Sequence, residues 1–159
     1  MGGSTWEYVT PYRGSVEATL DALHEEVFQE LYGDGAMFGS RAELYADEQY
    51  MAEAGTHSIL DVRHVVATTE PPGMGSGADY GTLRPLAPER LVHHFGTERP
   101  TVEQYEAATA RAHEALLRWT PGPDTTLNGE HTMRWTGRYV LLHTDGRPTH
   151  VGIFGSSGD

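Results

Sequence analysis

The chain contains two segments in which apolar residues recur every three or four positions, as on one face of a helix. The first set of apolar positions is Val16, Leu20, Leu23, Val27 and Leu31. The second set is Tyr105, Ala108, Ala112, Leu116 and Trp119. Ser15 is a suitable N-cap for the first segment, and Thr101 has the capping-box spacing to Gln104 at the start of the second. Helices are therefore predicted over residues 15–31 and 101–119.

Helix-start and helix-stop residues extend this pattern. Ser40 and Glu43 have the spacing of a capping box, which predicts a second helix from residue 40 to about residue 54. Pro88 suits a first helical turn and Gly96 a C-terminal stop, so a short helix is predicted between them. The run Pro-Gly-Pro at residues 121–123 is expected to end the helix predicted over 101–119.

Other segments favour β-strands. Residues 6–12 alternate bulky and small side chains, and residues 57–66 are rich in β-branched residues. Residues 80–86 predict a short strand, which Pro85 restricts to a sheet edge or to a strand end.

The C-terminal residues predict a β-hairpin. Strands over residues 138–143 and 148–154 flank Asp145-Gly146, the preferred pair for a type I′ turn. A loop of these two residues would pair Leu142 with Thr149. Because residues 140–142 are apolar on both faces, the hairpin is expected at the centre of the sheet, and the residues after 154 are expected at the surface.

These elements together predict a two-layer α+β domain. The sheet is expected to have four or five mainly antiparallel strands, with the helices around 15–31 and 101–119 packed on one face. The chain has 159 residues, enough for one substantial core but not for two, so residues 1–159 are predicted to form a single domain. Residues 67–79 are rich in glycine and proline and are expected to form a mobile loop, a possible lid over a site.

Composition and charge exclude several classes of function. The absence of cysteine excludes disulfides, thiolate nucleophiles and thiolate metal sites. Eleven Lys+Arg against 23 Asp+Glu give a net charge of −12, and the basic residues are scattered, so nucleic-acid binding is not expected. The longest apolar run, Tyr139–Leu142, is far too short to cross a membrane, and the N-terminus does not resemble a signal peptide. We therefore expect a cytoplasmic protein that binds neither membranes nor nucleic acid, and its oligomeric state stays open.

The most promising reactive side chains belong to the strand predicted over 57–66. Alternate residues of a strand share a face, so His57, Asp61 and Arg63 would point to the same side. Asp61 would orient His57 for general acid–base catalysis, and Arg63 would hold an anionic or carbonyl group of the substrate. The same pattern also fits a solvent-exposed face, or one on which Asp61 and Arg63 pair with charges of neighbouring strands.

Four further residues are predicted to bind substrate. Tyr12 and Arg13 lie just before the first predicted helix, whose N-terminus would favour an anion. Tyr139 and His150 are predicted to share one face of the hairpin beside Gly152, whose missing side chain leaves room for a ligand. A packed turn around Tyr12, and a helix lying over Gly152, account for the same residues without a ligand.

No metal-binding or nucleotide-binding motif occurs. The nine histidines form neither His-x-His nor His-Glu-x-x-His, and His93 and His94 would point to different sides of a helix. The chain also lacks the Gly-x-Ser-x-Gly nucleophile motif and the glycine motifs that bind phosphate. No metal and no cofactor is therefore expected, while a metal site assembled from distant segments stays open.

Four short runs resemble a group of small uncharacterised bacterial proteins. The runs are Thr10–Tyr12, Gly55–Asp61, Phe95–Thr101 and Phe154–Asp159, and the resemblance extends over nearly the whole chain. Some members carry the label ADP-ribosyl-(dinitrogen reductase) hydrolase. The established hydrolases of that name are larger, all-helical and use a dimagnesium site, three features from which this α+β pattern departs. The resemblance implies one intact domain rather than that activity.

Two hypotheses about function follow. The first is a metal-free enzyme or binding protein for a small polar molecule, which uses general acid–base chemistry of the hydrolase, isomerase or cyclase type through His57 and Asp61. The alternative is an acidic immunity or inhibitor protein that binds a basic partner enzyme, for which the net charge of −12 would speed association. A pocket around His57 would favour the first, and a flat acidic surface without a cavity the second.

Overall fold

A computed structural model describes residues 3–119 and 124–158 of the chain, which contain one mixed five-stranded sheet. Its strands are β1 (Ser4–Pro11), β2 (His64–Val65), β3 (Thr82–Pro85), β4 (Thr136–Thr144) and β5 (Arg147–Ser157). The sheet has the order β1-β5-β4-β3-β2, in which β1 and β4 are antiparallel to β5 while β3 is parallel to β4 and β2 to β3. The prediction of α+β structure is confirmed, but the prediction of a mainly antiparallel sheet is wrong. Long crossovers join β2 to β3 and β3 to β4, and such connections allow parallel pairing.

The helices are α1 (Val16–Tyr32), α2 (Arg41–Ala46), α3 (Glu48–Glu53), α4 (Pro88–Phe95) and α5 (Val102–Leu117), with 3₁₀ turns η1 (Ile59–Asp61), η2 (Gly77–Asp79) and η3 (Leu127–Glu130). The predicted caps of α1 and α5 are confirmed: Ser15 caps α1, and Thr101 and Gln104 form the capping box of α5. Ser40 caps α2, but the Glu43 carboxylate accepts a hydrogen bond from the Gly39 amide instead of the Ser40 amide, so the capping box predicted there is incomplete. The helix expected over 40–54 is divided at Asp47, which ends α2 and caps α3. The Pro-Gly-Pro stop predicted at 121–123 lies outside the described residues. No helix in the described part of the chain is long and apolar enough to cross a bilayer.

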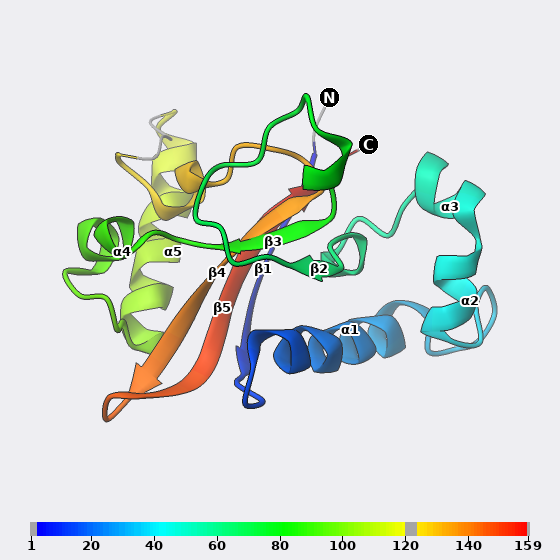
Figure 1. Cartoon of the computed structure of the whole chain (residues 1–159), viewed down its shortest axis with the longest axis horizontal. Helices are drawn as coiled ribbons and strands as arrows, with labels where there is room; N and C mark the ends of the chain where they lie inside the picture. The colour runs from blue at the N-terminus through cyan, green and yellow to red at the C-terminus, as the bar shows by residue number, and fades with distance from the viewer. Residues whose placement is uncertain (1–2, 120–123, 159) are drawn as a thin grey trace.

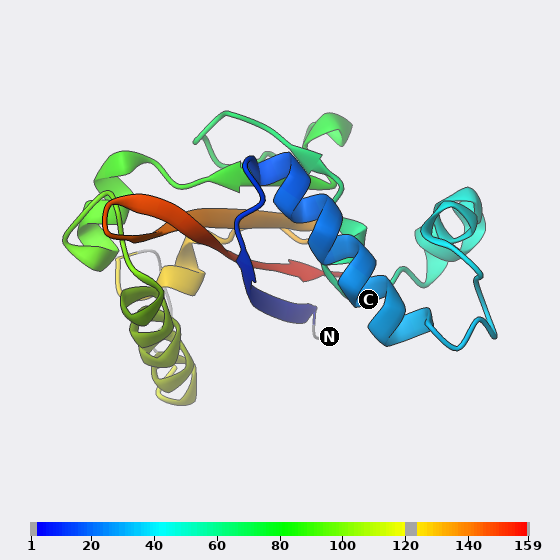
Figure 2. The same cartoon turned by 90° about the horizontal axis from the view of Figure 1, so that it is seen from below.

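The helices α1 and α5 pack on opposite faces of the sheet, as Figures 1 and 2 show. The buried residues of α1 form one core with Val151 and Ile153 of β5, whereas Tyr105 and Ala108 of α5 form another with Phe154. Neighbouring residues of a strand point to opposite faces. The prediction that both helices cover one face is therefore wrong, because each helix has one apolar stripe and the sheet is apolar on both sides.

The space above Gly152 is filled by α5. A Cβ atom added at Gly152 would lie 2.5 Å from Cε2 of Tyr105, so only glycine lets this ring approach the sheet. Tyr105 is 1% exposed, and its hydroxyl has no hydrogen-bond partner among the described residues. The room that was predicted to hold a ligand is occupied by an aromatic ring.

The segment 57–66 is not the strand that its β-branched residues predict. His57 has a left-handed backbone with φ of 54°, and Ser58 caps the 3₁₀ turn η1 by accepting a hydrogen bond from the Leu60 amide. Asp61 accepts hydrogen bonds from the amide and the hydroxyl of Thr56, at 2.9 and 2.8 Å. Such local side-chain bonds compete with a strand ladder, and only His64–Val65 pairs with the sheet.

The hairpin forms around Asp145 and Gly146, whose φ angles of 52° and 75° suit the predicted type I′ turn. A bulge between Leu142 and His143 shifts the register by one residue, so Leu142 pairs with His150 instead of Thr149. Tyr139 now pairs with Ile153. The shift places Tyr139 and His150 on opposite faces of the sheet, which corrects the prediction that they share one.

Residues 155–158, which were expected at the surface, are buried. The strand β5 continues to Ser157, which pairs with Ser4 and is 0% exposed. Its hydroxyl donates a 2.6 Å hydrogen bond to Asp61 Oδ2. The small residues after Phe154 suggested a loose tail, but they allow close packing: the ring of Trp6 lies where a Cβ atom of Gly155 would be.

The loop predicted to be mobile is held to the sheet by two arginines. Arg84 and Arg138 pair across β3 and β4, and each is 5% exposed. Arg84 donates to the Glu70 carbonyl and, at 2.6 Å, to the Asp79 carboxylate, while Arg138 donates to the Thr69 carbonyl. The loop is thus held near both ends.

Candidate functional site

The three residues predicted to form an acid–base site do not converge. His57 is exposed, and its Nδ1 lies 3.3 Å from Ser4 Oγ. Asp61 is hydrogen-bonded to Thr56 and Ser157. Arg63 lies over the Tyr45 ring, 4.6 Å from its centroid, as a cation–π pair. With no strand to align them, each group has a different partner, and a shared catalytic role for His57 and Asp61 has no geometric support.

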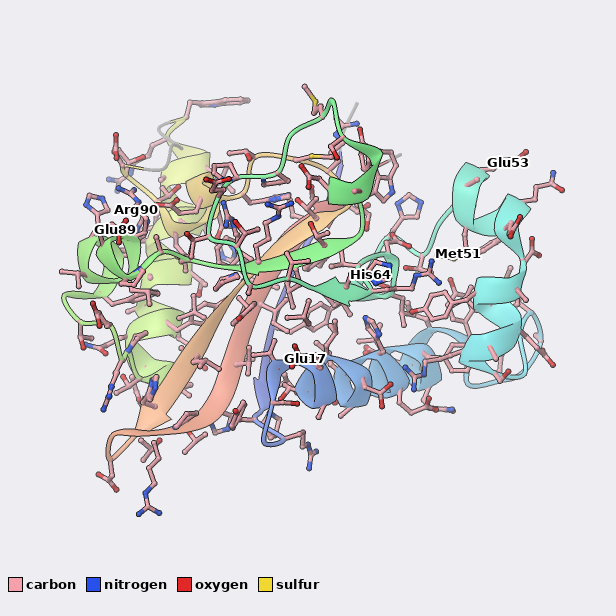
Figure 3. The ribbon with its side chains drawn as sticks, viewed as in Figure 1. Glu17, Met51, Glu53, His64, Glu89 and Arg90 are labelled. Carbon is pink, nitrogen blue, oxygen red and sulfur yellow. The ribbon has the colours of Figure 1, made fainter. Side chains whose placement is uncertain are left out.

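Asp61 and Arg63 nevertheless reach a common cleft. It has a volume of about 500 Å³ and lies between α3 and β2, with Met51 and His64 on its two sides (Figure 3). Its wall includes an edge-to-face pair of Tyr80 and Trp135, whose centroids lie 6.2 Å apart. The cleft is wide and open to solvent, and His57 does not line it.

The other predicted substrate-binding residues lie apart from one another. Tyr12 donates a 2.9 Å hydrogen bond to the Gly14 carbonyl, and the Arg13 amide donates to Thr19 Oγ1. These bonds form the packed turn before α1, and the Arg13 side chain is exposed. His150 Nδ1 contacts Thr149 Oγ1 at 3.0 Å. Tyr139 lines a separate cavity at the edge of β4.

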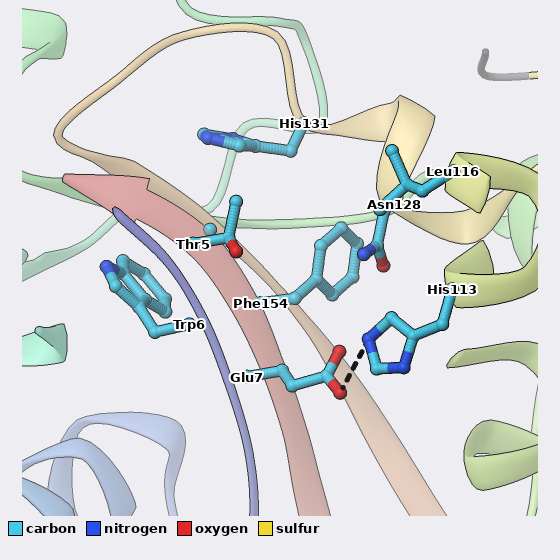
Figure 4. Close-up of a pocket in the computed structure, with 9 residues that line it drawn as sticks. Thr5, Trp6, Glu7, His113, Leu116, Asn128, His131 and Phe154 are labelled. Carbon is cyan, nitrogen blue, oxygen red and sulfur yellow. Dashed lines mark ion pairs between the residues drawn. The ribbon is translucent and has the colours of Figure 1, made fainter. Parts of the chain in front are cut away.

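A more enclosed pocket lies between α5 and the β1–β5 strands, and we call it the β1–α5 pocket (Figure 4). Its volume is about 290 Å³. Its lining residues are Thr5, Trp6, Glu7, His113, Leu116, Asn128, His131, Phe154 and Gly155. None of them was singled out from the sequence as a site residue.

A pair of facing side chains, Glu7 and His113, crosses this pocket from strand to helix. Because Trp6 is directed to the α1 side of the sheet, its neighbours Thr5 and Glu7 point to the α5 side. His113 lies on α5 four residues after Thr109, on the flank that faces β1. Glu7 Oε1 and His113 Nε2 are 3.2 Å apart, with side chains 35% and 59% exposed. The pair is therefore accessible from solvent and from the pocket.

The turn η3 supplies the opposite wall, and Glu130 fixes its position. The Glu130 carboxylate accepts hydrogen bonds from Arg90 Nε and His94 Nε2 of α4, the second at 2.8 Å. Burial opposes ionisation, but these two hydrogen bonds outweigh it and hold the pKa of Glu130 below its ordinary value. With Leu127 also buried, η3 is anchored on both sides of Asn128.

His131 is a neutral member of the pocket. Its Nε2 lies 2.8 Å from the Ser156 hydroxyl of β5. Burial, and then the positive charge of Arg138, lower the pKa of His131 to about 4. At neutral pH the ring therefore acts as a hydrogen-bonding group and not as a charge.

Asn128 leaves one polar atom without a partner. Its Oδ1 is buried and accepts no hydrogen bond from any residue in the described part of the chain. Phe154 of β5 and Leu116 of α5 are the apolar side chains that line the pocket together with Asn128 (Figure 4). An unsatisfied buried acceptor costs about 1–3 kcal/mol, which a ligand with an N–H or O–H group would recover.

The sequence carried only weak signs of this pocket. Glu7 is a single acidic residue in an alternating strand, and Asn128 and His131 lie in a polar stretch without periodicity. His113 lies beside the apolar stripe of α5, next to Ala112 in the sequence and four residues after Thr109. That spacing was the one available signal.

No group of three His, Asp or Glu side chains within residues 3–119 and 124–158 is arranged to hold a metal ion. Comparisons with protein-family models, with curated protein sequences and with solved structures gave no match, so the function of this chain has to be argued from its own side chains.

Proposed function

We propose that the β1–α5 pocket binds a small polar molecule and modifies it by general acid–base chemistry. The observation that carries the proposal is the Glu7–His113 pair, 3.2 Å apart, at a pocket that also contains the buried acceptor Asn128 Oδ1. Acid–base catalysis by a histidine is favoured by a second group that orients the ring and needs a bound substrate within its reach.

Each group has a defined role in this proposal. With Nε2–H of a neutral His113 facing the Glu7 carboxylate at 3.2 Å, Nδ1 is free to take a proton from the substrate, and the carboxylate stabilises the imidazolium that forms. Asn128 Oδ1 accepts a hydrogen bond from the substrate and fixes its orientation. Phe154 and Leu116 cover its apolar part. Hydrolysis, isomerisation and cyclisation by proton transfer all fit such a site.

The proposal is tested with a panel of small polar metabolites, screened for binding by saturation-transfer NMR. We expect the compounds that bind the wild type not to bind the variant Asn128→Leu, because leucine cannot accept their hydrogen bond. For any compound that is converted, His113→Gln should lower kcat about 100-fold or more.

The matched control is His93→Gln, which changes an exposed histidine of α4 that does not line the pocket. Binding and turnover should be unchanged in this variant. Compounds that bind Asn128→Leu as tightly as the wild type, or that His113→Gln converts at the wild-type rate, would contradict the proposal.

One surface feature favours the alternative, an acidic protein that binds a basic partner enzyme. The helix α1 contains no Lys or Arg, and its exposed carboxylates are Glu17, Asp21, Glu25, Glu26 and Glu30. Arg41 is the cation that pairs with two of them, Asp21 and Glu25. The pocket and the acidic helix lie on opposite faces of the sheet, so this second role would not involve Glu7 or His113.

A further inference from the structure

In the described part of the chain, the outer edge of β4 has no strand beside it in its second half. The strand β3 pairs with β4 only from Gly137 to Tyr139, although β4 continues to Thr144. The chain that follows β3 takes the place of a further strand here: the His143 amide donates a 2.8 Å hydrogen bond to the Pro100 carbonyl. Between this chain and β4 lies a cavity of about 260 Å³, which we call the β4-edge cavity.

One wall of the β4-edge cavity is apolar. It is formed by Leu86 and Leu91, together with the β4 residues Val140 and Leu141. Tyr139, one of the predicted substrate-binding residues, also lines it. The cavity is slightly smaller than the roughly 300 Å³ at which pockets for drug-sized ligands begin, so its occupant would be a small molecule.

Two polar groups at this cavity lack partners among the described residues. His143 Nδ1 is buried without a hydrogen bond, an arrangement that costs stability unless something binds there. The Arg99 guanidinium lies at the exposed side, and no carboxylate of residues 3–119 and 124–158 is within 4.0 Å of it. Glu98 also lines the cavity but forms no ion pair with Arg99.

We propose that the β4-edge cavity binds a small monocarboxylate with an apolar body. Its carboxylate would accept hydrogen bonds from the Arg99 guanidinium and from His143 Nδ1–H, and its hydrocarbon part would pack on Leu86 and Leu91. The planar guanidinium matches two carboxylate oxygens at once, and a charged acceptor makes such hydrogen bonds stronger. This site is separate from the β1–α5 pocket and does not depend on the function proposed for it.

The test uses phenylacetate as the probe and phenylacetamide as its uncharged counterpart of the same shape, with binding measured by isothermal titration calorimetry. We expect phenylacetate to bind at least about tenfold more tightly than phenylacetamide. Arg99→Gln, a surface change that leaves the core intact, should abolish this difference. Arg13→Gln, which removes an exposed arginine that does not line the cavity, should leave it unchanged.

The possible results separate clearly. Equal binding of acid and amide, or an unchanged preference in Arg99→Gln, would overturn the proposal, as would the absence of phenylacetate binding at millimolar concentration. Inorganic phosphate that binds as tightly, with the same dependence on Arg99, would show a general anion site and would also overturn it. A change in the chemical shift of the His143 amide on addition of phenylacetate, seen in a ¹H–¹⁵N spectrum, would support the β4-edge cavity as the binding site.

Discussion

Gly152→Val is expected to lower the free energy of unfolding by about 3 kcal/mol, a large effect for an overpacked core. The new Cβ atom would lie 2.5 Å from Cε2 of Tyr105, a ring that is 1% exposed and cannot move outward without lifting α5 from the sheet. Urea denaturation followed by circular dichroism measures the change.

Two further variants make this result specific. Gly75→Val adds the same side chain where a Cβ atom would meet nothing within 4 Å, and it should change stability by less than about 0.5 kcal/mol. The change Tyr105→Leu replaces the ring with a smaller side chain and should relieve the clash. The double variant with Gly152→Val should therefore lose at least about 1 kcal/mol less free energy of unfolding than the sum of the two single variants. Strict additivity would contradict the packing of α5 on β5.

A second large effect is expected in mild acid, where the protein should lose about 3 kcal/mol of stability between pH 6.5 and pH 4 through His131 alone. The folded pKa of His131 is about 4, against about 6.5 for an unfolded histidine. The folded state thus favours the neutral ring. This contribution is complete above about pH 6.5 and is lost as the pH falls towards the folded pKa. Burial also lowers the pKa of His24, which adds to the loss in the same direction.

The measurement compares the free energy of unfolding at pH 7 and at pH 4 in the wild type and in His131→Gln. Glutamine cannot be protonated, so the variant should lose less stability between the two pH values than the wild type does. His93→Gln, at an exposed position, serves as the control and should behave as the wild type. An equal loss in His131→Gln and the wild type would show that His131 is not held neutral.

Local patterns in the sequence predict the helices of this fold well. The stripes and caps around α1 and α5 specify both, because the hydrogen bonds of a helix and its caps lie within a few residues of each other. The turn at Asp145-Gly146 is local in the same way. The parallel pairing of β2, β3 and β4 and the face that each helix covers depend on contacts between distant residues, and both were predicted wrongly.

The failure at residues 57–66 has a specific cause. Its β-branched residues favour a strand, yet Ser58 and Asp61 bond to nearby backbone and hydroxyl groups, and Ser157, 96 positions away from Asp61, completes that arrangement. The neighbouring side chains of Ile59 and Leu60 are then buried together in the core around α1 instead of alternating between two faces. Neither the contact with Ser157 nor the resulting separation of His57 from Asp61 is visible in the local sequence.

The β1–α5 pocket was missed because its polar residues come from separate segments of the chain. Glu7, His113, Asn128 and His131 are brought together only when β1 pairs with β5 and α5 packs over them. No spacing rule relates a strand residue to a histidine 106 positions later. A histidine that belongs to no sequence motif, such as His113, can be assigned to a site only when the structure shows its neighbours.

The location of the functional site is tested most directly by the ring signals of the nine histidines in a ¹H–¹³C correlation spectrum, recorded with and without a compound that binds. Binding in the β1–α5 pocket should shift the signals of His113 and His131 and leave those of His57 and His64 in place. A shift of the His64 signals with no change at His113 and His131 would move the site to the cleft beside β2, which His64 lines, and contradict the function proposed for the β1–α5 pocket.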